Sequence, residues 1–178
     1  YGTLLLPPGN SSPHSVPLIV NPYGGPGVGA ARDRWGGKHL FFDELLAEHG
    51  FAVLHVDNRG MAGRGRDFEQ VCWHNFGPPQ FADQMASIDQ VLRDYPQLDP
   101  HRLGWWGWSW GGSFTLFALS HSNSFLAGVS GAPVTDWRDY DSIYTERYLG
   151  LPSEDAQNYK ADSDVSSAAD LHGHILIL

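Results

Sequence analysis

The sequence is poor in basic residues and in cysteine. Lys and Arg together number 11 against 20 Asp and Glu, which gives a formal net charge of -9 at pH 7. A surface of this sign repels polyanions, so we expect no nucleic acid among the partners. The single cysteine, Cys72, has no second thiol with which to form an intrachain disulfide. No apolar run approaches the roughly 18 residues of a membrane span, so we expect no membrane segment in this chain.

Charge of either sign is scarce, whereas turn-forming residues are plentiful. Charged residues make up 17% of the chain, and there are 21 Gly and 12 Pro. Hydrophobic residues, at 42%, supply enough apolar surface for a sizeable core. A length of 178 residues suits one domain, so we assign residues 1–178 to one domain and expect no second domain in this chain.

Short apolar runs bounded by Gly, Pro and Asn alternate with longer segments of helical spacing. This alternation is typical of parallel βαβ units and predicts an α/β fold, with a mostly parallel sheet and helices on both faces. The Gly- and Arg-rich segment from about residue 57 to residue 79 is expected to be a long loop. Strands are expected at 2–6, 16–20, 51–56, 103–106, 126–129 and 174–178, and helices at 40–48, 81–95, 111–120 and 137–148.

The strongest chemical signal is the segment Gly107-Trp108-Ser109-Trp110-Gly111-Gly112, between a predicted strand and a predicted helix. A G-x-S-x-G motif in this context forms a nucleophile elbow, where glycines let the chain reverse tightly around an exposed serine. The Trp110 amide, at the amino end of the helix, can then point at a developing oxyanion. The alternative is a glycine-rich turn that carries an incidental serine.

A second candidate oxyanion donor lies in the turn after the strand predicted at 16–20. The segment Tyr23-Gly24-Gly25-Pro26-Gly27 follows that strand. A Tyr23 hydroxyl or a loop amide there can stabilise negative charge on the substrate oxygen. The alternative is that this loop is only a tight turn.

Several motifs, spread over nearly the whole chain, occur in a common order. They are Asn21-Pro22-Tyr23-Gly24-Gly25-Pro26, Asp57-Asn58-Arg59-Gly60, the elbow at 107–112, Ala132-Pro133-Val134-Thr135-Asp136-Trp137, and YDSIYTERYLGLP at 140–152. In this combination the chain resembles the prolyl oligopeptidase family of serine peptidases, and within it the dipeptidyl peptidase IV-like branch.

The resemblance implies an α/β-hydrolase fold and hydrolysis of peptide bonds after proline or alanine, without a cofactor. By this likeness Ser109 is the nucleophile, and Tyr23 with the Trp110 amide forms the oxyanion hole. The implied substrate is a peptide with proline near its amino terminus, and a periplasmic or secreted location is favoured. The pocket for the residue before the scissile bond is implied to be lined by Trp110, Val134, Trp137, Tyr140 and Tyr144.

The spacing of aromatic residues supports this pocket independently of the resemblance. Trp137, Tyr140 and Tyr144 are spaced i, i+3 and i+7, which places them on one face of the helix predicted at 137–148. A row of such rings forms a flat-walled slot that suits a proline ring. The alternative is that the rings only bury the helix against the sheet.

The sequence offers Ser109 no good general base. His121 falls near the far end of the helix that starts at the elbow, and His172 and His174 precede the last strand, at the wrong edge of the sheet. In the family, the triad acid follows the strand that matches 175–178, and the histidine comes later. We therefore expect an interior fragment of a longer enzyme, a partial domain incomplete at its C-terminal end, lacking an upstream β-propeller and inactive alone.

Several alternatives stay open on the sequence. One is an acylaminoacyl peptidase or an esterase on the same fold, and another is a noncatalytic interaction module. The sequence does not separate dipeptide, tripeptide and internal release, although release from the amino terminus is favoured. The apolar strand at 175–178 is expected to be an exposed edge, which favours a homo-oligomer. No metal site is expected, because metal-ligand spacing is lacking around His39, His49, His55 and His74.

Overall fold

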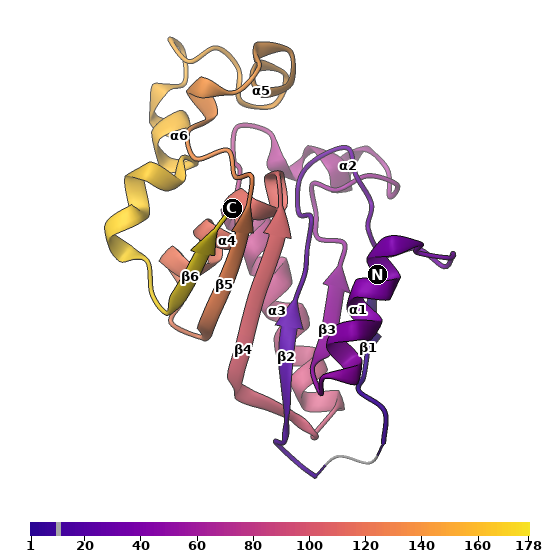
Figure 1. Ribbon diagram of the computed structural model, residues 1–178. Helices are drawn as coiled ribbons and strands as arrows, with labels where there is room; N and C mark the ends of the chain where they lie inside the picture. Colours follow the sequence, from indigo (N-terminus) through magenta and orange to yellow (C-terminus); the bar gives the residue numbers. More distant parts are fainter. Residues whose placement is uncertain (10–11) are drawn as a thin grey trace.

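A six-stranded sheet forms the centre of the computed structural model, which describes residues 1–9 and 12–178 (Figure 1). The strand order is β1-β3-β2-β4-β5-β6. β1 pairs with β3 antiparallel, and the other neighbouring strands pair in parallel. The strands are β1 (Gly2–Leu5), β2 (Val16–Val20), β3 (Ala52–Val56), β4 (Leu98–Trp108), β5 (Phe125–Gly131) and β6 (His174–Ile177).

Helices lie on both faces of this sheet, with α1 in front of β3 and with α3 and α4 behind (Figure 1). This arrangement confirms the predicted α/β fold. Pro78 is the first residue of α3, a position where the missing N–H of proline costs nothing. The helices are α1 (Lys38–Glu48), α2 (Arg66–Glu69), α3 (Pro78–Asp94), α4 (Trp110–His121), α5 (Ser142–Leu149) and α6 (Ala156–Ala161), with 3-10 turns η1 (Gln70–Cys72), η2 (Trp137–Asp139) and η3 (Asp164–Asp170).

The main core lies between the sheet and the helices α3 and α4. The Trp105 ring of β4 stands edge-on to Phe114 of α4 and Phe125 of β5, with ring centroids 5.1 and 5.0 Å apart. Every residue of α4 from Trp110 to Leu119 is buried, as expected of a helix that is apolar on all sides. Tight packing around α4 therefore fixes the position of its amino end, where Ser109 lies.

The opposite face of the sheet is only partly covered. α1 lies over β3, and Phe42 of α1 contacts Trp106 with ring centroids 5.3 Å apart. Beside α1 an apolar cavity of about 590 Å³ opens over β4 and β5, lined among others by Trp106, Trp108 and Leu178. β6 is the outer strand next to this cavity, and all of its residues are exposed. The predicted exposed apolar edge is thus present.

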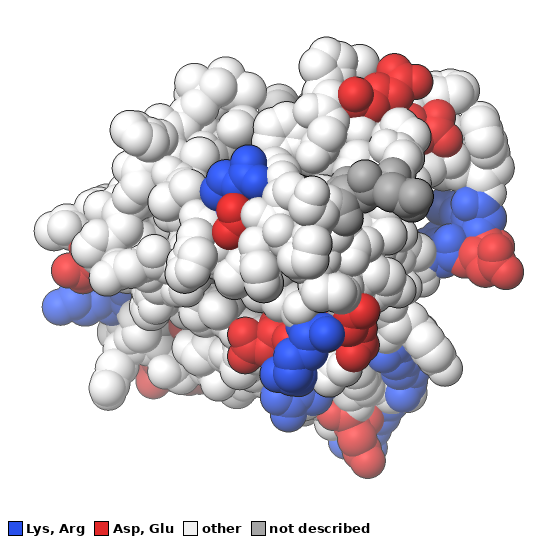
Figure 2. Space-filling model, turned by 90° about the horizontal axis from the view of Figure 1, so that it is seen from below, with Lys and Arg blue, Asp and Glu red and all other residues white. Residues whose placement is uncertain are grey.

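Charged side chains are sparse on the surface as well as in the sequence. Figure 2 shows the end of the molecule from which the parallel strands start, where acidic and basic side chains occur in small groups of mixed sign. Arg102 and Asp99 form an ion pair of mixed sign of this kind, with 2.7 Å between Nε and Oδ2. Among the described residues, no helix is both long enough and apolar enough to span a membrane.

One predicted helix is wrong, because the segment 137–148 is divided. The turn η2 ends before Tyr140, which is extended with φ -94° and ψ 168°. Asp141 is extended too, and its carboxylate accepts the Tyr144 N–H at 2.8 Å, so that α5 starts only at Ser142. An aspartate that caps a following helix is a strong start signal, and here it outweighs the helical spacing of the rings.

The remaining differences concern short elements. The segment 57–79 is not a continuous loop, because it contains α2 and η1 and the start of α3. α6 and η3 were not predicted, and β4 is longer than the strand expected at 103–106. The other predicted strands and helices are present with small shifts at their ends.

Candidate active site

Ser109 stands at the tight bend between β4 and α4. Its φ of 58° and ψ of -120° are costly for a residue with a side chain. The bend is held by the Ser109 N–H, which donates to the Gly131 carbonyl at 2.8 Å, and by the Ser109 carbonyl, which accepts from Gly112 N at 2.8 Å. A Cβ on Gly107 would lie 2.4 Å from the Gly111 carbonyl oxygen, so this approach requires glycine. These features have the geometry of a nucleophile elbow.

Two hydrogen-bond donors lie near the Ser109 side chain. Trp110 is the first residue of α4, and the first N–H groups of a helix have no partner within the helix. The Tyr23 hydroxyl is the second donor. Burial raises the pKa of Tyr23, neighbouring Tyr140 raises it further, and the nearby Ser109 side chain lowers it. Tyr23 is therefore protonated at neutral pH and within reach of the serine.

The loop that carries Tyr23 rests flat on aromatic rings. A Cβ on Gly24 would lie 2.5 Å from the Phe114 ring, and one on Gly25 would lie 2.6 Å from the Trp110 ring. The Asn58 amide donates to the Gly24 carbonyl at 3.0 Å. Only residues without side chains fit between this loop and α4, which brings Tyr23 close to the elbow.

A buried glutamine braces this arrangement, and the sequence analysis missed it. Gln84 of α3 donates from Nε2 to the Asn58 Oδ1 and to the Val56 carbonyl, both at 2.9 Å. Its exposed fraction is 0%. The signal was in the sequence, because Gln80, Gln84 and Ile88 are spaced by four residues on the buried face of α3.

The predicted pocket residues come together beside Ser109, although not on one helix face. The Trp137 ring lies 6.1 Å from the Tyr140 ring and 6.5 Å from the Tyr144 ring, and 6.1 Å from the Trp110 ring. Val134 is tied to α4, since its N–H and carbonyl bond the Ser113 hydroxyl at 2.8 and 2.9 Å. We call the rings of Trp110, Trp137, Tyr140 and Tyr144 the aromatic slot.

Two further rings pack against the aromatic slot and were not predicted. Phe76, from the segment before α3, lies 4.8 Å from Trp137 and 5.7 Å from Trp110. The Tyr148 ring lies 5.2 Å from the ring of Tyr144, and Tyr144 precedes it by one turn of α5. The i, i+4 spacing of the two tyrosines was a usable signal. The sequence carried no such signal for Phe76, because the position of Phe76 depends on contacts with distant segments.

The Tyr144 hydroxyl, which belongs to the slot, is uncharged at neutral pH. Burial raises the pKa of Tyr144 far above its usual value, and neighbouring Tyr23 raises it further. Its hydroxyl is buried without a hydrogen-bond partner among the described residues. The slot is thus built of aromatic rings, and the Tyr144 hydroxyl within it carries no charge at neutral pH.

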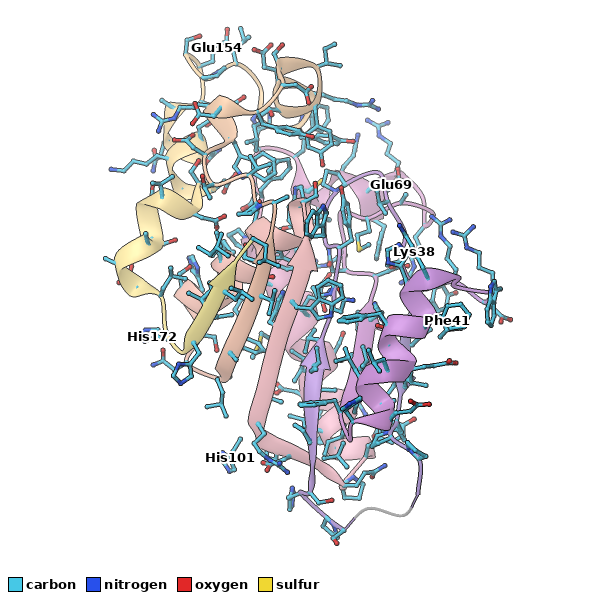
Figure 3. The ribbon with its side chains drawn as sticks, viewed as in Figure 1. Lys38, Phe41, Glu69, His101, Glu154 and His172 are labelled. Atoms are coloured by element: carbon cyan, nitrogen blue, oxygen red, sulfur yellow. The ribbon has the colours of Figure 1, made fainter. Side chains whose placement is uncertain are left out.

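No histidine of the described residues contacts the Ser109 side chain through a hydrogen bond. His121 ends α4, and its Nδ1 lies 2.9 Å from the Phe117 carbonyl oxygen. The main-chain N–H of His172 donates to the Leu119 carbonyl, and His174 begins β6. Figure 3 shows His172 at the starting end of β6, whereas Ser109 follows the finishing end of β4.

Two other kinds of chemistry find little support in the described residues. Cys72 is buried, and burial raises the pKa of its thiol to about 11, so little thiolate is present at neutral pH. Among the described residues, no group of three or more His, Cys, Asp and Glu side chains is placed to hold a metal ion.

Comparison with known proteins gives one consistent set of relatives. Residues 42–178 match the sequence profile of the prolyl oligopeptidase family. Mouse dipeptidyl peptidase 8 is 37% identical over 160 residues, which cover 89% of this chain and 18% of that protein. A probable dipeptidyl peptidase 4 of Aspergillus flavus is 38% identical over 162 residues, covering 89% of this chain and 21% of that protein.

Solved structures agree with these sequence relatives. The crystal structure of Porphyromonas gingivalis dipeptidyl peptidase 4 superposes with a TM-score of 0.92 at 35% identity, covering 99% of this chain and 25% of that chain. A putative dipeptidyl aminopeptidase IV from Bacteroides ovatus gives a TM-score of 0.91 at 34% identity, again with 99% and 25% covered. The chain thus spans roughly a fifth to a quarter of the length of the relatives it matches.

Proposed function

The chain belongs to the prolyl oligopeptidase family, and from that premise we propose that it is the nucleophile-bearing part of a serine dipeptidyl peptidase. The proposed reaction is hydrolysis of a peptide bond after proline, or after alanine, near the amino terminus of a peptide. One observation carries the proposal: the strained bend at Ser109 lies next to both Tyr23 and the aromatic slot.

The proposed chemistry is acyl transfer. The Ser109 oxygen attacks the carbonyl carbon of the scissile bond, and its proton passes through a general base to the leaving amine. The Tyr23 hydroxyl and the Trp110 N–H hold the negative charge that develops on the carbonyl oxygen. Water then hydrolyses the ester between Ser109 and the acyl group and restores the serine.

The aromatic slot supports the choice of proline. A proline ring is already rigid, so it loses little conformational entropy when it enters a slot between flat rings. Burial of its methylene groups contributes about 0.8 kcal/mol each. Alanine fits the same slot but buries less surface, and a long or charged side chain meets the walls formed by Trp137 and Tyr144.

We propose that the general base and the acid that orients it come from outside these residues. Ser109 has no imidazole partner among the described residues, and serine is a weak nucleophile without a base. The relatives are about four to six times as long as the part matched here, which leaves room for both groups. On this proposal the chain is a partial α/β-hydrolase domain.

Ser109→Ala tests the proposed nucleophile. In the longer protein that carries this chain, we expect hydrolysis of a chromogenic dipeptide that ends in proline, and labelling of Ser109 by a fluorophosphonate. Ser109→Ala should lower kcat by about 10⁵-fold or more and abolish the label, because it removes the oxygen that attacks both the substrate and the reagent. Ser124→Ala, a change at an exposed serine, is the matched control.

The 178 residues alone should show neither hydrolysis nor labelling, since they lack the proposed base. A rate from these residues that disappears in Ser109→Ala would show that the base lies within them. Full activity of Ser109→Ala in the longer protein would rule out Ser109 as the nucleophile.

A second expectation concerns association of the 178 residues through β6. The outer edge of β6 is unpaired among the described residues, and Leu176, Ile177 and Leu178 are exposed beside the apolar cavity. Exposed apolar edges pair with other chains. We expect the mass from light scattering to rise with concentration, and Ile177→Lys to reduce that rise. A monomer at all concentrations would contradict this expectation.

A further inference from the structure

Behind the aromatic slot lies a buried polar corner, formed by Asp162 and Ser163 between α6 and η3. Asp162 is 7% exposed and Ser163 is 2% exposed, although both side chains are polar. Burial of such groups is costly unless they are hydrogen-bonded. The bonds that these two residues make therefore show what the corner holds in place.

Trp137 is attached to this corner at two points. Its main-chain N–H donates to the Ser163 Oγ at 3.1 Å, and its indole Nε1–H donates to the Asp162 carbonyl at 3.0 Å. The Ser163 hydroxyl in turn donates to the Tyr159 carbonyl at 2.7 Å. Two bonds from opposite ends of one residue fix both the position of its backbone and the direction of its ring.

Phe76 is attached to the same corner. Its main-chain N–H donates to the Asp162 Oδ2 at 2.9 Å. The Phe76 ring then packs against Trp137 and Trp110, at 4.8 and 5.7 Å. The cavity that Phe76, Trp137 and Asp162 line measures only about 10 Å³, so the two rings pack closely against the corner.

We propose that the Asp162–Ser163 corner is a positioning element of the aromatic slot, which holds Trp137 and Phe76 at the spacing that favours a proline ring. The two residues act through these rings and do not touch the substrate. The effect on substrate choice rests on the proposed function, whereas the effect on Trp137 does not.

Ser163→Ala tests the proposal in the longer protein that carries this chain. It removes the acceptor of the Trp137 amide but no atom of the slot. We expect hydrogen exchange at the Trp137 amide, followed by mass spectrometry, to be at least tenfold faster. The ratio of kcat/KM for a proline substrate to that for an alanine substrate should fall at least fivefold, mainly through a higher KM for proline.

Two further variants separate positioning from general stability. Ser163→Thr retains the hydroxyl and should restore the ratio. Ser167→Ala removes a serine hydroxyl of the same segment, which bonds Asp164 and Ser120 rather than the slot, and should leave both readouts unchanged. If Ser163→Ala does not fold, Asp162→Ala takes its place, because it removes the acceptor of the Phe76 N–H, and the same fall in the ratio is expected.

The outcomes are distinguishable. Unchanged exchange at Trp137 would overturn the positioning role, and an equal loss for both substrates would overturn the role in substrate choice. Absence of hydrolysis in the unsubstituted protein would overturn the proposed function and, with it, the effect on substrate choice. The exchange rates would then still decide whether the corner positions Trp137.

Discussion

Gly107→Ala is expected to destroy the bend that presents Ser109. The new Cβ would lie 2.4 Å from the Gly111 carbonyl oxygen and 2.6 Å from its carbonyl carbon. Both are backbone atoms at the start of a buried helix, so they cannot yield as a flexible side chain would. We expect a loss of about 3 kcal/mol or more in the free energy of unfolding, measured in urea, and loss of fluorophosphonate labelling at Ser109.

Gly104→Ala is the matched control for this substitution. Gly104 lies on the same strand β4, but a Cβ there would come no closer than 3.7 Å to another atom, which is ordinary contact. We expect its free energy of unfolding to change by less than about 1 kcal/mol and its labelling to persist. Equal effects of the two substitutions would show that the close approach at Gly107 does not hold the elbow.

The elbow could be predicted from sequence because its causes are local. A buried strand, a serine flanked by glycines and an apolar helix follow each other within 103–120, and the structure contains all three. Glycine is needed at 107 and 111 because two segments of backbone touch there. The same logic applies to the loop at Tyr23, whose glycines lie against rings of α4.

The aromatic slot shows where local reasoning fails. The spacing of Trp137, Tyr140 and Tyr144 indicated one helix face, yet Tyr140 and Asp141 are extended and interrupt the helix. The rings nevertheless meet, because the turn η2 and α5 are both packed against the same core. Residue types indicated that these aromatic rings gather, and the rings do meet, whereas helical periodicity predicted the wrong backbone.

The buried corner could not be predicted at all. Asp162 bonds the N–H of Phe76, which is 86 residues earlier in the chain, and no periodic pattern connects them. Aspartate in a turn is usually exposed, so sequence alone favours a solvated position. Only the packing of η3 against α4 shows that Asp162 and Asp164 are buried.

Burial of these two carboxyl groups leads to a prediction for stability against pH. Burial raises the pKa of Asp162 to about 7, with the Phe76 N–H lowering it and Asp155 raising it, and burial raises the pKa of Asp164 to about 8. Between about pH 4 and these values, the folded protein keeps protons that the unfolded chain has lost. Stability is therefore highest at the acidic end of this range, falls as pH rises, and levels off above about pH 8.

The charged groups nearby do not cancel this effect. Asp155 bonds His74 and Asn158, and Asp136 is paired with Arg138, which lowers the pKa of Asp136 to about 2. Asp136 therefore contributes stability that is lost only below about pH 4, outside the range that matters here. The Asp155 carboxylate is a negative charge near Asp162, and it disfavours ionisation of Asp162 further.

Asp164→Asn is expected to make the stability curve flatter. Asparagine cannot ionise, so the fall in the free energy of unfolding between pH 5 and pH 8 should shrink by on the order of 2 kcal/mol. Urea unfolding at several pH values measures this slope, and comparison within each variant removes any constant cost of the buried amide. Asp170→Asn, at the exposed end of η3, should keep the original slope. A flat curve in the unsubstituted protein would show that Asp162 and Asp164 do not hold these protons in the folded state.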